Sequence, residues 1–352
     1  MRIAQVAPLF ERVPPVTYGG TERVVAYLTD ALVDLGHDVT LFASGDSITK
    51  ARLVPAVPRS LRLDPSCRDQ LAPQIRQLEQ VSRLVHRFDV VHFHTGFIHL
   101  PLTRHLALPS VTTLHGRLDY PELTAMMGEF SDVPLVSISN DQRRPLRDAA
   151  WCATVYHGMP PRLLPYKSSH QGYAAFVGRI SPEKRLDRAI EIAERAGMEL
   201  RVAAKIDAVD REYYDREIEP LMRKPHVRYL GELGETQKAS LLGGAQALLF
   251  PIDWPEPFGM VIIESLSCGT PVVAWGHGSV PELIENGVNG FIVGSIPEAV
   301  TALRRTKDLH RAGCRATFDR RFSAERMARD YVTVYKRLRD SVRGGGLEAR
   351  TA

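Results

Sequence analysis

The sequence predicts an α/β protein made of two Rossmann-like domains in tandem. Its 352 residues are about twice the usual domain length of roughly 100 to 200 residues. Two successive series of short, β-rich apolar runs alternate with stretches of helical periodicity, which is the order typical of β-α-β units with a parallel sheet. Each half of the chain is therefore expected to form its own parallel sheet.

The expected helices and strands follow from the pattern of apolar residues. The clearest helix comes after Gly19-Gly20, where apolar residues recur at helical spacing, Thr21 can cap the start and Gly36 can end the helix. A long helical pattern also runs from residue 322 to about residue 338. The expected strands span residues 2–8, 38–43, 89–94, 110–114 and 133–138 in the first half, and 173–177, 199–204, 226–230, 246–250 and 271–274 in the second.

Residues 157–172 are rich in proline, glycine and serine, which is the composition of a linker between two domains. We therefore expect one domain over residues 1–165 and a second over residues 166–322. Residues 343–352, which contain a run of glycines, are expected to form a flexible tail. Domains joined in this way usually leave a cleft that can bind a ligand.

Composition and charge restrict the class of protein. With 44% hydrophobic and 24% charged residues the chain is typical of a globular protein, and no apolar run approaches the length of a bilayer span. The apolar stretch at the amino terminus is too short for a signal peptide, so a cytoplasmic location is expected. The net charge of +4 is not gathered into a lysine-rich run, so no nucleic-acid partner is expected.

Three further features concern membrane contact, cysteine chemistry and metal binding. The arginines between Arg304 and Arg321 fit a solvated helix face, with weak peripheral contact to an anionic membrane as the alternative. The four cysteines are far apart and predict neither a zinc site nor a disulfide framework. His92 and His94 alternate along one strand, but no third ligand is evident, so no metal site is expected.

Three places combine an apolar strand, a turn containing glycine, and a helix start, whose first amides have no partner inside the helix and can bind an anion. The first is Gly19-Gly20, which lacks the GxGxxG spacing of a dinucleotide site and fits a plain tight turn equally well. The second contains Arg179 and Lys184. A cation in a first helical turn faces the positive end of the helix dipole, so either Glu183 offsets Lys184 or the two cations bind phosphate.

The third place is the segment EPFGMVIIE, which spans Glu256 to Glu264. Gly259 puts Glu256 on a loop, while residues 260–268 fit a short helix that ends at Gly269. Glu264 then lies in the middle of that helix among apolar residues, and a carboxylate in such a place needs a partner if it is buried. Capping or a salt bridge would explain either glutamate singly, whereas two glutamates around a helix start also suggest a binding site.

Taken together, these segments resemble the family 4 retaining glycosyltransferases of the GT-B fold. The resemblance covers nearly the whole chain, and its most specific mark is the pair Glu256 and Glu264 with seven residues between them. It implies two Rossmann-like domains that face each other across a cleft, with a carboxyl-terminal helix over residues 323–340 that returns to the amino-terminal domain. It also implies a nucleotide-diphosphate sugar held mainly by the second domain and an acceptor held mainly by the first.

The resemblance assigns roles to residues that match the family's motifs. Arg179 and Lys184 would hold the diphosphate, Glu264 the ribose hydroxyls and Glu256 a hydroxyl of the donor sugar. Backbone amides of the helix start would bind sugar and phosphate, and the paired glycines would close over the phosphate from the opposite domain. The implied donor-binding residues are Gly19, Gly20, Phe258, Gly259, Met260, Val261 and Glu264, and the implied catalytic residues are His115, Arg179, Lys184 and Glu256.

Histidines and one departure from the family pattern complete these expectations. His115 ends an apolar strand and is similar to the family's cleft histidine, although a buried structural histidine is the alternative. His94 is expected on the acceptor side. In the segment from Tyr156 to Pro160, His157 and Pro160 replace the Asn and Asp of a family turn, so no catalytic role is expected there.

The resemblance implies a retaining, metal-independent transfer of a sugar to an acceptor hydroxyl, with no cofactor beyond the nucleotide-sugar donor. Two cations and helix amides would stabilise the charge that develops on the leaving diphosphate. A glycosidase that uses the two glutamates as acid and nucleophile is disfavoured, because Glu264 belongs to a helix interior. The remaining alternatives are a GT-B phosphorylase or sugar-nucleotide epimerase, and a sugar-nucleotide-binding protein without catalysis. The acceptor is expected to be a carbohydrate, a lipid-linked molecule or another small molecule.

Overall fold

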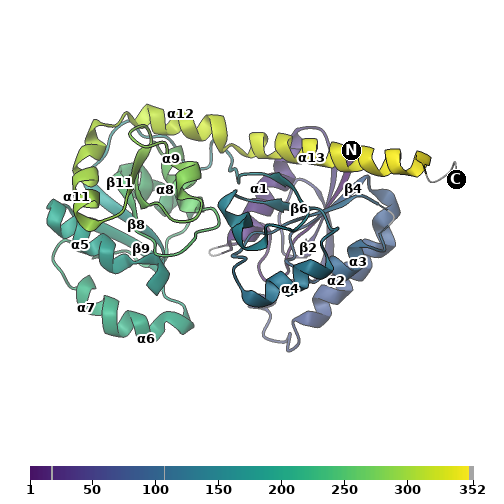
Figure 1. Ribbon diagram of the computed structural model, residues 1–352. Helices are drawn as coiled ribbons and strands as arrows, with labels where there is room; N and C mark the ends of the chain where they lie inside the picture. The colour runs from purple at the N-terminus through teal and green to yellow at the C-terminus, as the bar shows by residue number, and fades with distance from the viewer. Residues whose placement is uncertain (17–18, 107, 349–352) are drawn as a thin grey trace. The chain divides into compact units, whose positions relative to one another are not determined.

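The structure is a computed structural model and describes residues 1–16, 19–106 and 108–348 (Figure 1). The chain divides into two compact units. The first unit contains residues 1–160 and the segment that begins at Ser323, and the second unit contains residues 161–322. The division after residue 160 lies inside the segment 157–172, whose composition predicted a linker.

The first unit contains a seven-stranded, all-parallel sheet in the order β3-β2-β1-β4-β5-β6-β7. Its strands are β1 (Arg2–Val6), β2 (Asp38–Ser44), β3 (Arg52–Val57), β4 (Val90–Phe93), β5 (Ser110–Thr113), β6 (Leu135–Ser137) and β7 (Trp151–Thr154). Five of them were expected, whereas the two edge strands β3 and β7 were not. Edge strands are only partly buried, and Pro55 interrupts β3, so neither shows a continuous apolar run.

Helices pack around this sheet. They are α1 (Gly20–Asp34), α2 (Leu71–Leu84), α3 (Leu100–Thr103), α4 (Pro121–Glu129) and α13 (Ala324–Glu348). Helix α1 begins at Gly20 with Gly19 as its N-cap, so Thr21 lies inside the helix and is not the cap that the sequence suggested. At Gly36, which was expected to end this helix, φ is 81°, a backbone conformation that suits glycine.

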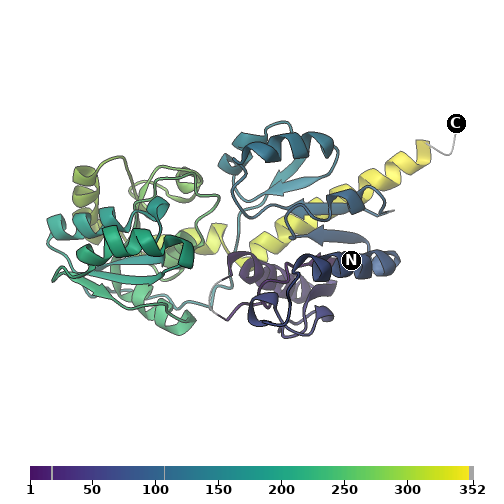
Figure 2. The same ribbon diagram turned by 90° about the horizontal axis from the view of Figure 1, so that it is seen from below.

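The carboxyl-terminal helix α13 belongs to the first unit and lies beside α1 (Figures 1 and 2). Its residues Tyr331 and Tyr335 are almost fully buried against the sheet, where their hydroxyl groups contact side chains of β1, β4 and β5. The helix continues to Glu348, past the expected end at residue 340 and into the segment expected as a flexible tail. Residues 349–352 of that segment lie outside the described residues.

The second unit contains a six-stranded parallel sheet in the order β10-β9-β8-β11-β12-β13. Its strands are β8 (Tyr173–Arg179), β9 (Leu200–Lys205), β10 (Val227–Tyr229), β11 (Ala245–Phe250), β12 (Val272–Trp275) and β13 (Gly290–Val293). The edge strand β13 was not expected. The helices are α5 (Leu186–Ala196), α6 (Arg211–Tyr213), α7 (Glu219–Met222), α8 (Glu235–Gly244), α9 (Met260–Ser267), α10 (Val280–Leu283), α11 (Ile296–Arg305) and α12 (Arg311–Arg321). Helices α5 and α11 lie side by side, and their apolar faces share one core with the sheet (Figure 1).

The arginine-rich stretch in α11 and α12 is not a uniformly solvated face. Arg311 is buried, and its guanidinium donates hydrogen bonds to the carbonyl oxygens of Lys167, Gly243 and Ala245. These bonds connect the start of the second unit to its sheet. In the part of the chain that the structure describes, no helix is both long and apolar enough to cross a membrane.

Candidate functional site

Two loops at the carboxyl ends of β8 and β11 form the main candidate site. The strands are adjacent and parallel, so the segments that follow them leave the sheet at the same edge, where α/β proteins bind ligands. After β8, which ends at Arg179, residues Pro182–Lys184 form a short 3-10 turn. Arg185 then adopts a left-handed conformation with φ of 53°, and α5 begins at Leu186. Lys184 therefore precedes α5, whereas the sequence predicted that it lies in the first turn of the helix.

The loop after β11 carries the EPFGMVIIE segment. Gly259 is the N-cap of α9 with φ of 83°, a value that favours glycine. Ser279, in the segment that follows β12, holds this loop in place. Its amide donates to the Glu256 carbonyl oxygen at 2.9 Å, and its hydroxyl donates to the Phe258 carbonyl oxygen at 2.7 Å. Met260 and Val261 form the first turn of α9, whose amides have no partner within the helix.

Lys184 and Glu256 meet in this site. The ammonium group of Lys184 forms an ion pair with Oε2 of Glu256, and both side chains are largely buried, with exposed fractions of 18% and 13%. The indole Nε1 of Trp254 donates to the same oxygen at 3.0 Å, and the Trp254 ring lies 4.9 Å from the ammonium nitrogen. Glu256, which lies 72 residues further along the chain, is therefore the acidic partner of Lys184.

Arg179 lies among three carboxylates. It pairs with Glu183, and its guanidinium nitrogens lie 3.7 Å from Asp207 and 3.4 Å from Asp210. Burial raises the pKa of Asp210 and the charge of Arg179 opposes this rise, while Glu183 and Asp207 add to it. Glu183 thus contacts Arg179, whereas the sequence suggested it as a partner for Lys184.

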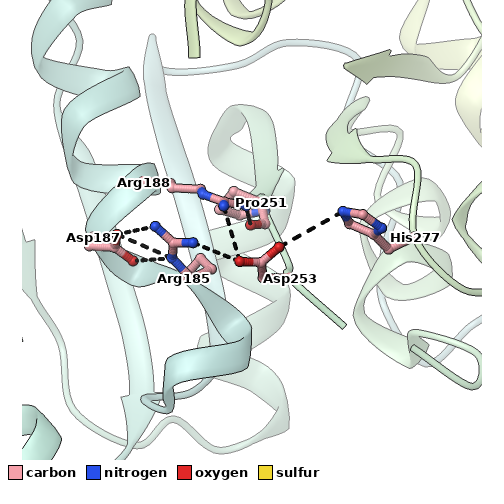
Figure 3. A network of polar contacts seen from close by, with 6 residues as sticks. All are labelled: Arg185, Asp187, Arg188, Pro251, Asp253 and His277. Carbon is pink, nitrogen blue, oxygen red and sulfur yellow. Dashed lines mark hydrogen bonds and ion pairs between the residues drawn. The ribbon is translucent and has the colours of Figure 1, made fainter. Parts of the chain in front are cut away.

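A network of charged side chains fastens the β11 loop to α5 (Figure 3). Asp253 accepts hydrogen bonds from Arg185 at 2.8 Å and from Arg188 at 3.1 Å, and His277 lies 4.0 Å from its other oxygen. The Asp253 amide also donates to the Glu183 carbonyl oxygen at 2.8 Å. Because the two loops are bonded in this way, the positions of Lys184 and Glu256 are set together.

Glu264 lies in the interior of α9 and is only 6% exposed. The expected partner exists, because Lys238 of α8 forms an ion pair with Glu264 Oε1. Lys238 itself is only 17% exposed, so this is a largely buried pair. A ligand that donates a hydrogen bond to Glu264 would therefore share the carboxylate with a lysine.

In the first unit, Gly19 is required by its surroundings. Its φ is 143°, and a Cβ atom there would lie 2.8 Å from the Cβ of Pro15. A side chain at Gly20 would meet nothing within 4 Å among the described residues. Gly20 is exposed at the start of α1, whereas the requirement for glycine at position 19 is explained by its backbone conformation and packing.

His115 and His94 are neighbours within a buried polar network of the first unit. His94 Nδ1 lies 2.9 Å from His115 Nε2, and His94 Nε2 lies 2.8 Å from the amide oxygen of Gln5. The ring of His157 stacks on that of His115 with 5.2 Å between centroids. Burial lowers the pKa of His115 to about 3 and that of His94 well below its usual range, so both rings are uncharged at neutral pH. One nitrogen of His115 is thus engaged with a neighbouring histidine.

His92 and the turn from Tyr156 to Pro160 have structural contacts. His92 contacts the Tyr335 hydroxyl at 2.8 Å and that of Thr113 at 2.7 Å. In the turn, a Cβ atom on Gly158 would lie 2.3 Å from the carbonyl oxygen of Ser323, so the turn packs closely on the segment that leads into α13. Across residues 1–16, 19–106 and 108–348, no group of three or more acidic, histidine or cysteine side chains is arranged to hold a metal ion.

The residues that sequence reasoning missed are the partners of those it identified. They are Trp254 and Asp253 beside Glu256, Asp207 and Asp210 beside Arg179, and Lys238 beside Glu264. Lys238 lies 26 residues before Glu264 on another helix, so no local spacing relates the two. Trp254 is two residues from Glu256, and an aromatic residue so close to a motif glutamate was the one available signal.

Comparison with known protein families covers both units. Residues 18–176 match the model described as Glycosyltransferase Family 4, and residues 166–305 match the model described as Glycosyl transferases group 1. The glycogen synthase of Mycobacterium tuberculosis is 26% identical over an alignment that covers 90% of this chain and 86% of the synthase.

Two solved structures are similar over nearly the whole chain. The glycosyltransferase AviGT4, involved in avilamycin A biosynthesis, matches with a TM-score of 0.73 and 25% identity. The alignment covers 97% of this chain and 98% of the AviGT4 chain. Anabaena HepE in complex with UDP and glucose also has a TM-score of 0.73, with 19% identity and coverage of 96% and 99%. Because HepE is only 19% identical to this chain, its similarity shows a shared fold and nothing more.

Proposed function

Because this chain is a glycosyltransferase of the GT-B fold, similar to family 4, we propose that it transfers a sugar from a nucleotide-diphosphate sugar to an acceptor hydroxyl with retention of the anomeric configuration. The observation that carries the proposal is the meeting of Lys184 with Glu256 at the carboxyl edge of the second sheet, next to the amino end of α9. One cation, one carboxylate and a helix start are the groups that a sugar diphosphate requires.

In this proposal the second unit binds the donor. Lys184 and Arg179 hold the diphosphate, and the first-turn amides of α9 bind the phosphate and sugar from the other side. Glu256 accepts a hydrogen bond from a sugar hydroxyl, and Glu264 accepts one from the ribose. The complex of HepE with UDP and glucose supports a uridine nucleotide as the first donor to test.

The charge that develops on the leaving diphosphate determines the mechanism. When the bond between the anomeric carbon and the phosphate oxygen breaks, the pyrophosphate gains negative charge, which two cations and helix amides stabilise without a bound metal. The acceptor hydroxyl attacks from the same face, and its proton passes to the leaving phosphate, so the configuration is retained. Because Lys184 and Arg179 are paired with carboxylates, the donor phosphates must displace or share these contacts.

In the first unit, Gly19 and Gly20 at the start of α1 bind the donor phosphate and His115 after β5 contacts the sugar, while His94 after β4 lies on the acceptor side. Since the two rings are uncharged and hydrogen-bonded to each other, His115 orients a substrate and does not act as an acid. The acceptor is a carbohydrate, a lipid-linked molecule or another small molecule with a hydroxyl group.

The test removes both proposed phosphate cations. Thermal shift with UDP-, GDP-, ADP- and dTDP-sugars first identifies the donor, because a ligand that binds only the folded protein stabilises it. Turnover with that donor should then fall by at least about a hundredfold in the double variant Arg179→Ala with Lys184→Ala. The matched control, Arg223→Ala with Lys224→Ala, removes two cations of the same unit that form exposed ion pairs. Equal turnover in the two double variants would exclude the assigned phosphate role.

Four further measurements separate the alternatives and test retention and metal independence. A glycosidic product that forms only with added acceptor excludes a phosphorylase or an epimerase, whereas binding without any nucleotide release over a broad acceptor panel indicates a binding protein. The coupling constant of the anomeric proton in the product tests retention. Full turnover in the presence of EDTA tests independence from divalent metal ions.

A further inference from the structure

Trp254 contacts both charged groups of the proposed donor site. Its indole Nε1 donates a hydrogen bond of 3.0 Å to Glu256 Oε2, and its ring lies 4.9 Å from the Lys184 ammonium, within the range of a cation–π interaction. Phe250 at the end of β11 lies 5.6 Å from the same ammonium. The lysine head is therefore placed by two rings and one carboxylate.

These contacts fix the orientation of the Glu256 carboxylate. Oε2 accepts from both the Lys184 ammonium and the Trp254 indole, and neither contact uses Oε1. A carboxylate held at one oxygen by two donors cannot rotate freely, so the direction of its other oxygen is defined as well. An ionised carboxylate only accepts hydrogen bonds, so the group that it recognises must be a donor such as a sugar hydroxyl.

The backbone around Trp254 is itself restrained. The adjacent Asp253 is bonded to Arg185 and Arg188 (Figure 3). The Glu256 amide donates to the Trp254 carbonyl oxygen at 2.9 Å. The indole thus belongs to a turn whose backbone is anchored on Arg185 and α5. Such support is what keeps a binding group in its productive geometry.

We propose that Trp254 is a positioning residue of the donor site, which orients Glu256 toward the donor sugar through its indole N–H and holds Lys184 against Glu256 with its ring. This inference rests on the proposed function. It separates the two contributions: the N–H serves recognition of the sugar, whereas the ring serves the cation that binds the diphosphate.

Two substitutions of Trp254 distinguish these contributions. Trp254→Phe keeps a ring and removes the N–H, so kcat/KM for the nucleotide sugar should fall about tenfold, the size expected for one hydrogen bond to a charged group. The Kd of the free nucleoside diphosphate should stay within about twofold. Trp254→Leu removes the ring as well, so it should also weaken binding of the nucleoside diphosphate.

The matched control is Trp151→Phe, which removes an indole hydrogen bond to the Leu146 carbonyl oxygen in the first unit and should leave both constants unchanged. A Trp254→Phe variant that retains wild-type kcat/KM, or that loses nucleoside diphosphate affinity by the same factor as kcat/KM, would overturn the proposal.

An NMR measurement tests the contact without requiring turnover. The chain has three tryptophans, so the indole N–H signal of Trp254 is assigned by its absence in Trp254→Phe. In Glu256→Ala this signal should move upfield and exchange faster with solvent. An unmoved signal would disprove the Trp254–Glu256 contact, whereas a moved signal in a protein that never releases nucleotide would leave the contact standing and refute the proposed transferase function.

Discussion

His99 gives a quantitative prediction about stability. It is fully buried in the first unit between the hydroxyl groups of Thr95 at 2.9 Å and Thr112 at 2.6 Å, and it stacks on Phe93. Burial lowers the pKa of His99 to about 3. In the unfolded chain the same group has its ordinary pKa of about 6.5, so at mildly acidic pH only the unfolded state binds the proton.

The direction of the pH dependence of stability follows from this difference between the folded and unfolded pKa of His99. The stabilising contribution of an uncharged His99 is fully present above pH 6.5, and it is lost progressively as the pH falls toward 3. Each pH unit below the unfolded pKa costs about 1.4 kcal/mol. Since part of the interval from pH 7 to pH 5 lies above 6.5, His99 alone should lower the free energy of unfolding by about 2 kcal/mol over that interval.

The assay is urea unfolding of the wild type and of His99→Gln at several pH values. The variant should be less stable at pH 7 but should lose about 2 kcal/mol less between pH 7 and pH 5. The control Thr112→Val removes a hydrogen bond and keeps the titrating group, so its stability should fall while its pH dependence stays that of the wild type. Parallel pH dependences for His99→Gln and the wild type would refute the reasoning.

Three other predictions concern the second unit. Lys238→Met should cost about 3–5 kcal/mol in the free energy of unfolding, because it leaves the Glu264 carboxylate buried without its partner, and adding Glu264→Gln should recover most of the loss. If the second change recovers nothing, the pair does not explain how Glu264 is buried. Gly278→Ala should abolish donor binding, since its Cβ would lie 2.3 Å from a backbone nitrogen of the EPFG loop, whereas Gly287→Ala, also at positive φ but with open space around it, should cost only about 1–2 kcal/mol of stability and keep donor affinity. Calorimetry with the donor compares the two glycine variants, and equal affinities would contradict the predicted clash. Arg311→Leu should lower stability by more than about 3 kcal/mol in urea unfolding, because several buried carbonyl oxygens lose their donor, and a loss below about 1 kcal/mol would place Arg311 on the surface.

The interior strands could be predicted because burial on both faces of a parallel sheet requires continuous apolar runs, as at 2–8 or 246–250. The edge strands β3 and β7 escaped prediction for the same reason, since half-exposed strands tolerate residues such as Pro55 and Cys152, whereas β13 is largely buried and escaped because it is only four residues long. The N-cap of α1 was misplaced by two residues, because both Gly19 and Thr21 are acceptable N-caps and only the backbone at Gly19 decides between them.

The sequence by itself determined the two α/β halves, the helix start at Gly259 and the candidate residues Arg179, Lys184, Glu256 and Glu264, because periodicity, turn residues and motif spacing are local properties of the chain. The tertiary structure alone decided which charges meet. Lys184 pairs with a carboxylate 72 residues away, and Trp254 contacts both partners, because β8 and β11 are adjacent in the sheet. Contacts of this kind depend on strand order, which no local pattern encodes.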